Sequence, residues 1–199
     1  GFVAPQTFYA NVEINGNIQK FIFQENLKKE LLESNSLVEG PIIEGDERYT
    51  IEKGFNGKSL NKISLSRISN SRYIKNDIVK AEKSLEAITL MNQIYIQSHL
   101  TKKPNIELLK INKNIFKKYK FYENFEIYES LIYAMDAIHG QSHDDRRFYY
   151  DPINNYFIPI YYDGKSKILN NENSDSKSLK YLDKFIPIEA KKGASAALK

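Results

Sequence analysis

Acidic and imidazole side chains gather in one stretch of the chain, between residues 136 and 163. The members of this stretch are Asp136, His139, His143, Asp144, Asp145, Asp151 and Asp163. Two of the three histidines of the protein fall within it. Carboxylate and imidazole groups bind divalent metal ions and transfer protons, so this stretch is the part of the chain best suited to chemistry.

The elements predicted around these residues would bring several of them together. Asp145 leads into a predicted strand, and Asp163 follows the strand that returns from it. Because a hairpin returns its end to near its start, the two carboxylates are expected to face each other, and they would repel unless a cation lay between them. Oxygen ligands without thiolates favour Mg²⁺ or Mn²⁺. Asp136 and His139 lie three residues apart on a predicted helix and would share one face.

Two other interpretations of these residues stay open. Acids of this kind are also typical of turns and surfaces, where Arg146 and Arg147 would satisfy them as ion pairs. His139 and His143 have the spacing of a zinc-binding pair. Gly140, however, is expected to end the preceding helix with a positive φ, which would separate that pair.

A β-hairpin is predicted near the start of the chain. Apolar residues alternate along residues 8–14, and Asn15-Gly16 separates them from a second extended run at 17–23. An Asn-Gly pair favours a hairpin because both residues tolerate positive φ. The pattern becomes helical over residues 24–33, where leucines fall on one face.

The middle of the chain is predicted to be extended over residues 42–51 and irregular over 54–72. Asn76 or Asp77 is expected to cap a long helix that reaches about Leu100. The predicted buried stripe of this helix is Ile78, Ala81, Leu85, Ile88, Met91 and Tyr95.

A second helix is predicted over residues 123–138, ahead of a second hairpin. Its predicted buried stripe is Phe125, Tyr128, Leu131, Ile132, Met135 and Ile138. The hairpin would comprise strands at 147–150 and 156–162, joined by a turn at 151–155 in which proline presets φ. A last helix is expected at 178–185. Hairpins and helices in this order predict an α+β fold.

The composition indicates one globular domain, residues 1–190, followed by a flexible tail at 191–199. The net charge of +4 comes from lysines that are spread along the chain, so we expect no nucleic-acid partner. No apolar run approaches the roughly 18–20 residues of a membrane helix, and no signal peptide is visible. The absence of cysteine excludes disulfides and thiolate metal ligands.

Three segments of the chain resemble the CotH kinase family, a group of atypical kinases named after a spore-coat protein. They are the strand, Asn-Gly turn and returning strand of residues 11–25, the Arg-Arg-Phe-Tyr-Tyr-Asp-Pro run at 146–152 that follows His-Gly at 139–140, and the Pro-Ile-Tyr-Tyr-Asp-Gly run at 159–164. The resemblance implies an atypical protein-kinase-like fold. In it, the first hairpin precedes a mainly helical lobe, and the second hairpin carries the metal site.

The resemblance also implies roles for single residues. Asp163 corresponds to the metal-binding aspartate of the family, and Asp145 stands where the family usually has a metal-binding asparagine. Asp136 lies where the catalytic aspartate is expected, which orients or deprotonates the attacking hydroxyl. Glu25 would contact the nucleotide or a lysine.

The family carries its phosphate-binding lysine ahead of the first hairpin, whereas no Lys or Arg precedes Asn11 in this chain. Lys53 or Lys58 would then replace it, or a preceding segment or partner chain would complete the fold.

The implied reaction transfers the γ-phosphoryl group of ATP to a hydroxyl, that of a Ser or Thr of a protein, with Mg²⁺ or Mn²⁺. Two other function classes stay open. One is a non-catalytic structural or binding module with the same fold, and the other is a metal-dependent hydrolase that uses His139, His143 and the neighbouring acids. The compartment is left open between the cytoplasm and a cell-surface or spore-coat location.

Overall fold

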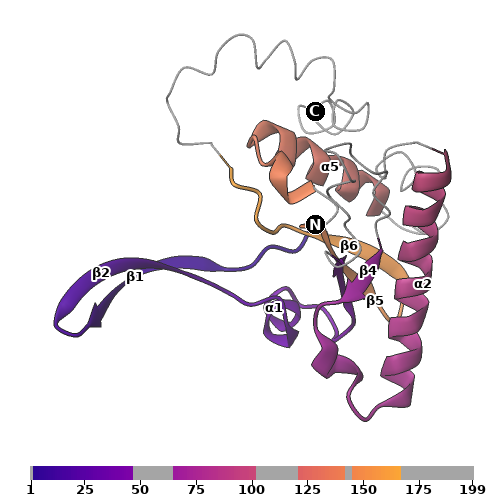
Figure 1. Cartoon of the computed structure of the whole chain (residues 1–199), viewed down its shortest axis with the longest axis horizontal. Coiled ribbons are helices and arrows are strands. Elements are labelled where there is room, and N and C mark those ends of the chain that lie inside the picture. The colour runs from indigo at the N-terminus through magenta and orange to yellow at the C-terminus, as the bar shows by residue number, and fades with distance from the viewer. Residues whose placement is uncertain (1, 47–64, 102–120, 142–144, 167–199) are drawn as a thin grey trace, which may run out of the picture.

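The computed structural model describes residues 2–46, 65–101, 121–141 and 145–166. They form a body of sheet and helices from which a β-hairpin projects (Figure 1). The predicted α+β class is confirmed. Outside the described residues lie Lys53, Lys58, His143, Asp144, the predicted helix at 178–185 and the predicted tail at 191–199.

The projecting hairpin, which we call the arm, consists of β1 (Thr7–Ile14) and β2 (Asn17–Gln24) (Figure 1). The strands are antiparallel, and every residue of β1 has a partner in β2. Asn15 and Gly16 form the turn with φ values of 53° and 78°, the positive values that a tight two-residue hairpin turn needs. The first predicted hairpin is confirmed.

The body is built on a four-stranded antiparallel sheet with the order β4-β3-β5-β6. Its strands are β3 (Ile42–Gly45), β4 (Ser66–Ile68), β5 (Arg147–Asp151) and β6 (Tyr156–Ile160). Nearly every residue of β3, β5 and β6 is buried, so the sheet is the centre of the core. The second predicted hairpin is confirmed as β5 and β6, whereas β4 falls in a stretch predicted to be irregular.

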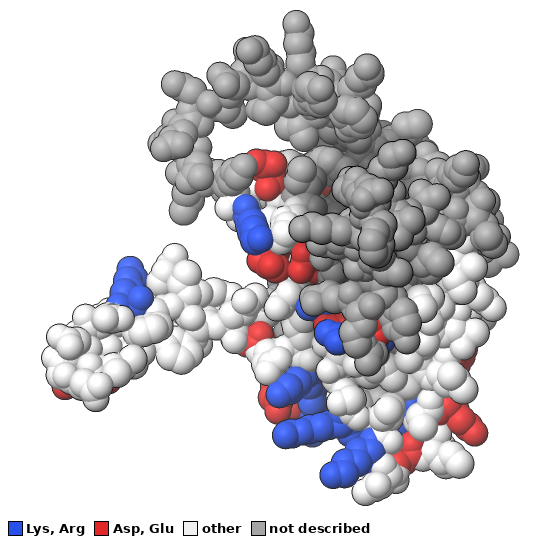
Figure 2. Space-filling view, viewed as in Figure 1, with Lys and Arg blue, Asp and Glu red and all other residues white. Residues whose placement is uncertain are grey.

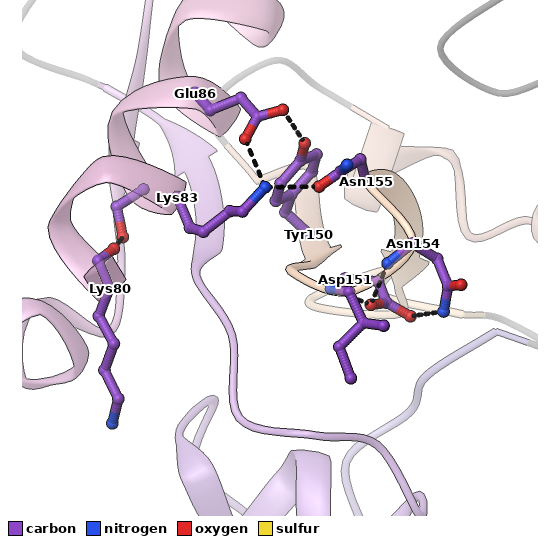
Figure 3. Close-up of polar contacts among 9 residues, drawn as sticks. Lys80, Lys83, Glu86, Tyr150, Asp151, Asn154 and Asn155 are labelled. Atoms are coloured by element: carbon purple, nitrogen blue, oxygen red, sulfur yellow. Dashed lines mark hydrogen bonds and ion pairs between the residues drawn. The ribbon is translucent and has the colours of Figure 1, made fainter.

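The carboxylate of Asp151 holds the turn between β5 and β6. Its Oδ1 accepts hydrogen bonds from the backbone N–H groups of Ile153 at 2.8 Å and Asn154 at 3.0 Å, and its Oδ2 accepts one from the Asn154 side chain (Figure 3). Asn155 completes the turn with a φ of 57°. Side-chain hydrogen bonds of this kind explain why Asp and Asn favour turns.

The longest helix, α2 (Ile78–Thr101), begins as predicted after Asp77, whose Oδ1 accepts a hydrogen bond of 3.0 Å from the Lys80 N–H. Its predicted buried stripe is wrong at the N-terminal end, where Ile78 and Leu85 are 76% and 66% exposed. The buried face carries Ser84, Ala87, Met91, Ile94 and Tyr95. The small side chains on this face let the helix lie close to the body.

Polar contacts fasten α2 to the second hairpin. The hydroxyl of Tyr150 donates a 2.8 Å hydrogen bond to Oε1 of Glu86, and Lys83 donates to both Glu86 and Asn155 (Figure 3). The helix therefore braces β5 and the turn that follows it.

The short helix α1 (Lys29–Ser34) begins later than the predicted helix over residues 24–33. The Glu25 N–H donates to the Gln6 carbonyl at 2.8 Å, which extends the pairing of the arm by one position. The start of the predicted helix is therefore extended backbone. The predicted leucine face is buried all the same, at Leu27, Leu31 and Leu32.

The second predicted helix is divided. α5 (Phe121–Ala134) ends before Asp136, which has a φ of 50°, and a 3₁₀ turn, η4 (Ile138–Gln141), follows. Asp136 and His139 therefore do not share a helical face, contrary to the prediction. Gly140 does not have the predicted positive φ either, because Asp136 reverses the chain at the helix end in its place.

The core joins the sheet to α1, α2 and α5. Among the residues of the predicted α5 stripe whose side chains are described, Tyr128 and Ile132 are buried, whereas Leu131 is 37% exposed. Val3 extends the edge of the sheet beside β6, because its N–H donates to Pro159 and its carbonyl accepts from Tyr161. None of the helices in the described ranges combines the length and apolarity that crossing a bilayer requires.

Candidate metal centre

Three side chains able to bind a metal ion meet beyond the open end of the second hairpin. Nε2 of His139 lies 3.3 Å from Oδ2 of Asp145 and 3.6 Å from Oδ2 of Asp163. One donor atom from each residue lies within 4.8 Å of the other two. The side chains are 41%, 18% and 44% exposed, so this His-Asp-Asp cluster is open to solvent. Figure 2 shows acidic side chains on the face beside the base of the arm.

The hairpin places the two aspartates. Arg147 pairs with Ile160 at the open end of β5 and β6, so Asp145 and Asp163 leave the sheet at the same end. Sequence reasoning expected these carboxylates to approach each other for this reason, and the structure brings them together. Asp163 has a φ of 38°, which turns the chain sharply after the strand.

Close backbone contact brings His139 to the aspartates. A Cβ atom on Gly140 would lie 2.5 Å from the carbonyl oxygen of Tyr162 and 3.3 Å from Cα of Gly164. A Cβ atom on Gly164 would lie 2.9 Å from Cβ of Ala137. Glycine at both positions therefore allows η4 to touch the segment after β6, which aligns His139 with Asp163.

His139 was predicted as half of a zinc pair with His143 and, in the hydrolase alternative, as acting with the neighbouring acids; the kinase interpretation did not include it among the metal ligands. His143 lies outside the described residues, so that pair stays a prediction. The sequence signal for His139 in the cluster is the Gly that follows it, because a small residue next to a possible ligand permits close approach of backbone.

Asp136, the predicted catalytic residue, is not a member of the His-Asp-Asp cluster. It is partly buried in the bend between α5 and η4, three residues before His139. Its predicted role stays a prediction.

Glu25 lies at the base of the arm. Its carboxylate accepts hydrogen bonds from the backbone N–H of Gln6 at 3.1 Å and from the hydroxyl of Ser34 at 3.2 Å. These contacts fasten the arm to α1, so Glu25 has a structural function whatever else it binds. Lys53, the other residue predicted to bind the nucleotide, lies outside the described residues.

A polar cleft of about 390 Å³ opens where the arm meets the sheet. It is lined by Gln24, Glu25, Asn26, Leu27, Glu44, Ser69, Arg147 and Tyr162. Two of these residues lead to the cluster along the chain, because Tyr162 precedes Asp163 and Arg147 follows Asp145 by two positions. The chain therefore connects the cleft to the His-Asp-Asp cluster, although no residue of the cluster lines the cleft.

Glu44, in the lining of the cleft, pairs with two arginines, of which Arg147 also lines the cleft and Arg67 does not. Oε2 of Glu44 lies 2.6 Å from Arg147, and Oε1 lies 2.7 Å from Nε of Arg67. The guanidinium of Arg147 also lies 4.4 Å from the centre of the Tyr162 ring, a cation–π contact. Arg147, suggested from the sequence as a counter-ion of the hairpin acids, thus binds a glutamate of β3.

Arg146, the other suggested counter-ion, is buried with only 6% exposure. Burial raises the pKa of Tyr128 above its ordinary value, and the positive charge of Arg146 partly offsets this rise. Burial likewise raises the pKa of Tyr95, with the same opposing effect of Arg146. The charge of Arg146 therefore acts on Tyr128 and Tyr95, two buried tyrosines of the core.

A divalent cation fits the donors of the cluster. Ligand bonds of about 2.1 Å keep the donors of one ion no more than about 4.2 Å apart. Both His139 distances meet this limit, and the full spread of 4.8 Å requires only a small side-chain adjustment. Mg²⁺ prefers oxygen ligands alone, whereas one imidazole with two carboxylates suits Mn²⁺ or Zn²⁺ better.

A scan against protein-family models finds no match to this chain, and a search of curated proteins finds no similar sequence. Its function is therefore inferred from its own residues.

Proposed function

We propose that this chain is a metal-dependent phosphotransferase domain of the atypical-kinase type, which moves the γ-phosphoryl group of ATP to a Ser or Thr hydroxyl of a protein. The observation that supports it most is the meeting of His139, Asp145 and Asp163, in a chain that also has an open polar cleft lined by Tyr162 and Arg147. Phosphoryl transfer depends on positioning of the substrates and on cations that neutralise phosphate oxygens. The cleft would position the substrates, and the His-Asp-Asp cluster would hold a cation.

The metal ion, Mg²⁺ or Mn²⁺, would be held by Asp145 and Asp163 with His139, where it would withdraw charge from the phosphate oxygens. The cleft volume of about 390 Å³ is within the usual range for small ligands. In this proposal Glu25, at the cleft wall, and Lys53 bind the nucleotide.

Asp136 is the proposed base. As the bond between the γ-phosphorus and the ADP oxygen breaks, a bond forms from phosphorus to the substrate oxygen, and the hydroxyl proton passes to Asp136. One short bend carries both this aspartate and the ligand His139, so a movement of the bend would shift the two together.

The test is ATP turnover by the purified chain with Mn²⁺ or Mg²⁺, in the presence of a mixed Ser/Thr peptide substrate. Asp163→Ala is expected to lower turnover at least a hundredfold. Glu82→Ala is the matched control, because it removes an exposed acid from α2 and should leave the rate unchanged. Equal rates for Asp163→Ala and the unmodified chain would reject the proposal. Nucleotide-dependent thermal stabilisation without turnover would instead identify a binding module.

The imidazole in the cluster favours a second candidate, a metal-dependent hydrolase. Nε2 of His139 lies 3.3 Å and 3.6 Å from the two carboxylates, so an ion bound between them would have a nitrogen ligand as well as oxygen ligands. Zinc enzymes use such mixed sites to generate hydroxide from bound water. Stoichiometric zinc retained through purification, with release of inorganic phosphate from ATP without peptide phosphorylation, would favour the hydrolase over the kinase.

A further inference from the structure

The arm exposes many large apolar side chains to solvent, which is unfavourable for an isolated hairpin. Those on β1 and β2 that are more than a third exposed are Phe8, Tyr9, Ile14, Ile18, Phe21, Ile22 and Phe23. The arm extends away from the body (Figure 1). A two-stranded hairpin is marginally stable without a further surface to pack on, so this exposure calls for a partner.

The two faces of the arm differ in charge. Alternation along the paired strands places Phe8, Ala10, Val12, Ile14, Asn17, Gln19, Phe21 and Phe23 on one face, which we call the uncharged face. The opposite face carries both charged residues of the arm, Glu13 and Lys20, with Lys20 positioned over the ring of Tyr9. The uncharged face is therefore the one suited to burial.

The uncharged face is also uneven along its length. At the base, the rings of Phe8 and Phe23 stack with their centres 5.6 Å apart. At the tip, the corresponding cross-strand pair is the smaller Ile14 and Asn17. A second arm turned end to end would set the large base of one copy against the small tip of the other, as close packing requires.

We propose that the arm is a self-association surface, on which two copies of this chain pack their uncharged faces together in antiparallel orientation. Because each arm projects from its body, the two bodies would lie at opposite ends of the paired arms (Figure 1). Such an interface is isologous, with the same patch buried on both copies.

The area is sufficient for a weak dimer. An aromatic side chain that passes from full exposure to full burial buries about 150–250 Å². The phenylalanines of the uncharged face are only partly exposed, so with the smaller side chains beside them the faces of two copies would together bury on the order of 1,000 Å². Specific interfaces begin at about that size.

The test is sedimentation equilibrium of the full chain between micromolar and millimolar concentration. The unmodified chain is expected to dimerise, and Phe8→Lys with Phe23→Lys should weaken the dimer at least tenfold. The matched control is Tyr9→Lys with Ile22→Lys, the adjacent cross-strand pair on the opposite face, which should leave dimerisation unchanged. All four positions lie outside the core, so melting temperatures should change little.

The chain has no cysteine, so single-cysteine variants give a second readout. Val12→Cys at the middle of the uncharged face should form an intermolecular disulfide under mild oxidation, and Asn11→Cys on the other face should not. A monomer throughout the concentration range would overturn the proposal. So would equal weakening by the two lysine pairs.

Discussion

Gly140 lies against the carbonyl oxygen of Tyr162 so closely that a Cβ atom on the glycine would stand 2.5 Å from that oxygen. This contact joins the bend that carries His139 to the segment that carries Asp163. The geometry of the candidate metal centre therefore depends on a glycine that binds nothing itself.

Gly140→Ala is expected to separate the two segments and weaken metal binding. The added methyl group cannot be accommodated without a backbone shift, which typically costs about 1–3 kcal/mol in a packed site. Mn²⁺ affinity, measured by isothermal titration calorimetry, should fall at least tenfold while the chain stays folded. Gly16→Ala is the control, because it strains the turn of the arm but meets no neighbouring atom. Unchanged affinity in Gly140→Ala would show that the contact does not set the site.

His139→Asn is expected to lower the affinity for Mn²⁺ more than the affinity for Mg²⁺. Imidazole is a better ligand for Mn²⁺ or Zn²⁺ than for Mg²⁺, which favours oxygen. Loss of an outer-shell partner of a metal ligand costs about 10–100-fold in affinity, so loss of a ligand should reduce Mn²⁺ binding at least as much. Competition titrations of the two ions would measure the ratio. An identical loss for both ions would place His139 outside the coordination sphere.

Glu44→Ala is expected to destabilise the fold strongly. The carboxylate is 8% exposed and binds Arg147, itself only 11% exposed, so its removal leaves a buried charge without this partner. Breaking a buried ion pair from one side costs about 3–5 kcal/mol. Glu39→Ala is the matched control, because its pair with Lys80 is partly exposed and such pairs contribute about 0–1 kcal/mol. Urea unfolding would compare the two free energies.

Alkaline solution is expected to unfold the protein through its tyrosines. Burial raises the pKa of Tyr73, Tyr95, Tyr128, Tyr133, Tyr149 and Tyr150 above the ordinary value of 10.0. Above about pH 10 the unfolded chain therefore loses protons that the folded chain retains, so the free energy of unfolding falls as pH rises. Below that pH the contribution is fully present.

The measurement is tyrosinate absorbance recorded together with circular dichroism during a titration from pH 9 to 13. The buried tyrosines should ionise in one cooperative step that coincides with loss of structure. Tyr150→Phe removes the hydrogen bond to Glu86 and one of these ionisations, so its step should be smaller. Gradual ionisation with the fold intact would contradict the prediction.

Local signals account for the parts of the fold that were predicted well. Asn15-Gly16 specified the first turn, Asp77 specified the start of α2, and the second hairpin followed from its Asp-Pro turn and aromatic strands. Each of these features depends on contacts between residues near one another in the chain. The approach of Asp145 to Asp163 followed from the second hairpin for the same reason.

Features set by distant contacts could not be predicted. The periodicity of α2 did not reveal that its first turns bury Ser84 and Ala87 while Ile78 and Leu85 stay exposed, because that choice depends on what the helix packs against. The end of α5 depends on Asp136 adopting a positive φ, which the sequence pattern alone did not indicate. The place of His139 depends on Gly140 meeting Tyr162, a contact across the fold that no spacing within the chain reveals.

The pairing of β3 with β5 has a consequence for synthesis on the ribosome. Ile42 of β3 pairs with Tyr149 of β5. About half of the chain must therefore be synthesised after β3 before its partner strand β5 is complete. Until then the nascent chain presents an apolar strand with an open edge, a form that aggregates readily. Fragments that stop short of residue 147 are accordingly expected to be insoluble, and folding of the whole chain to be slow for its size.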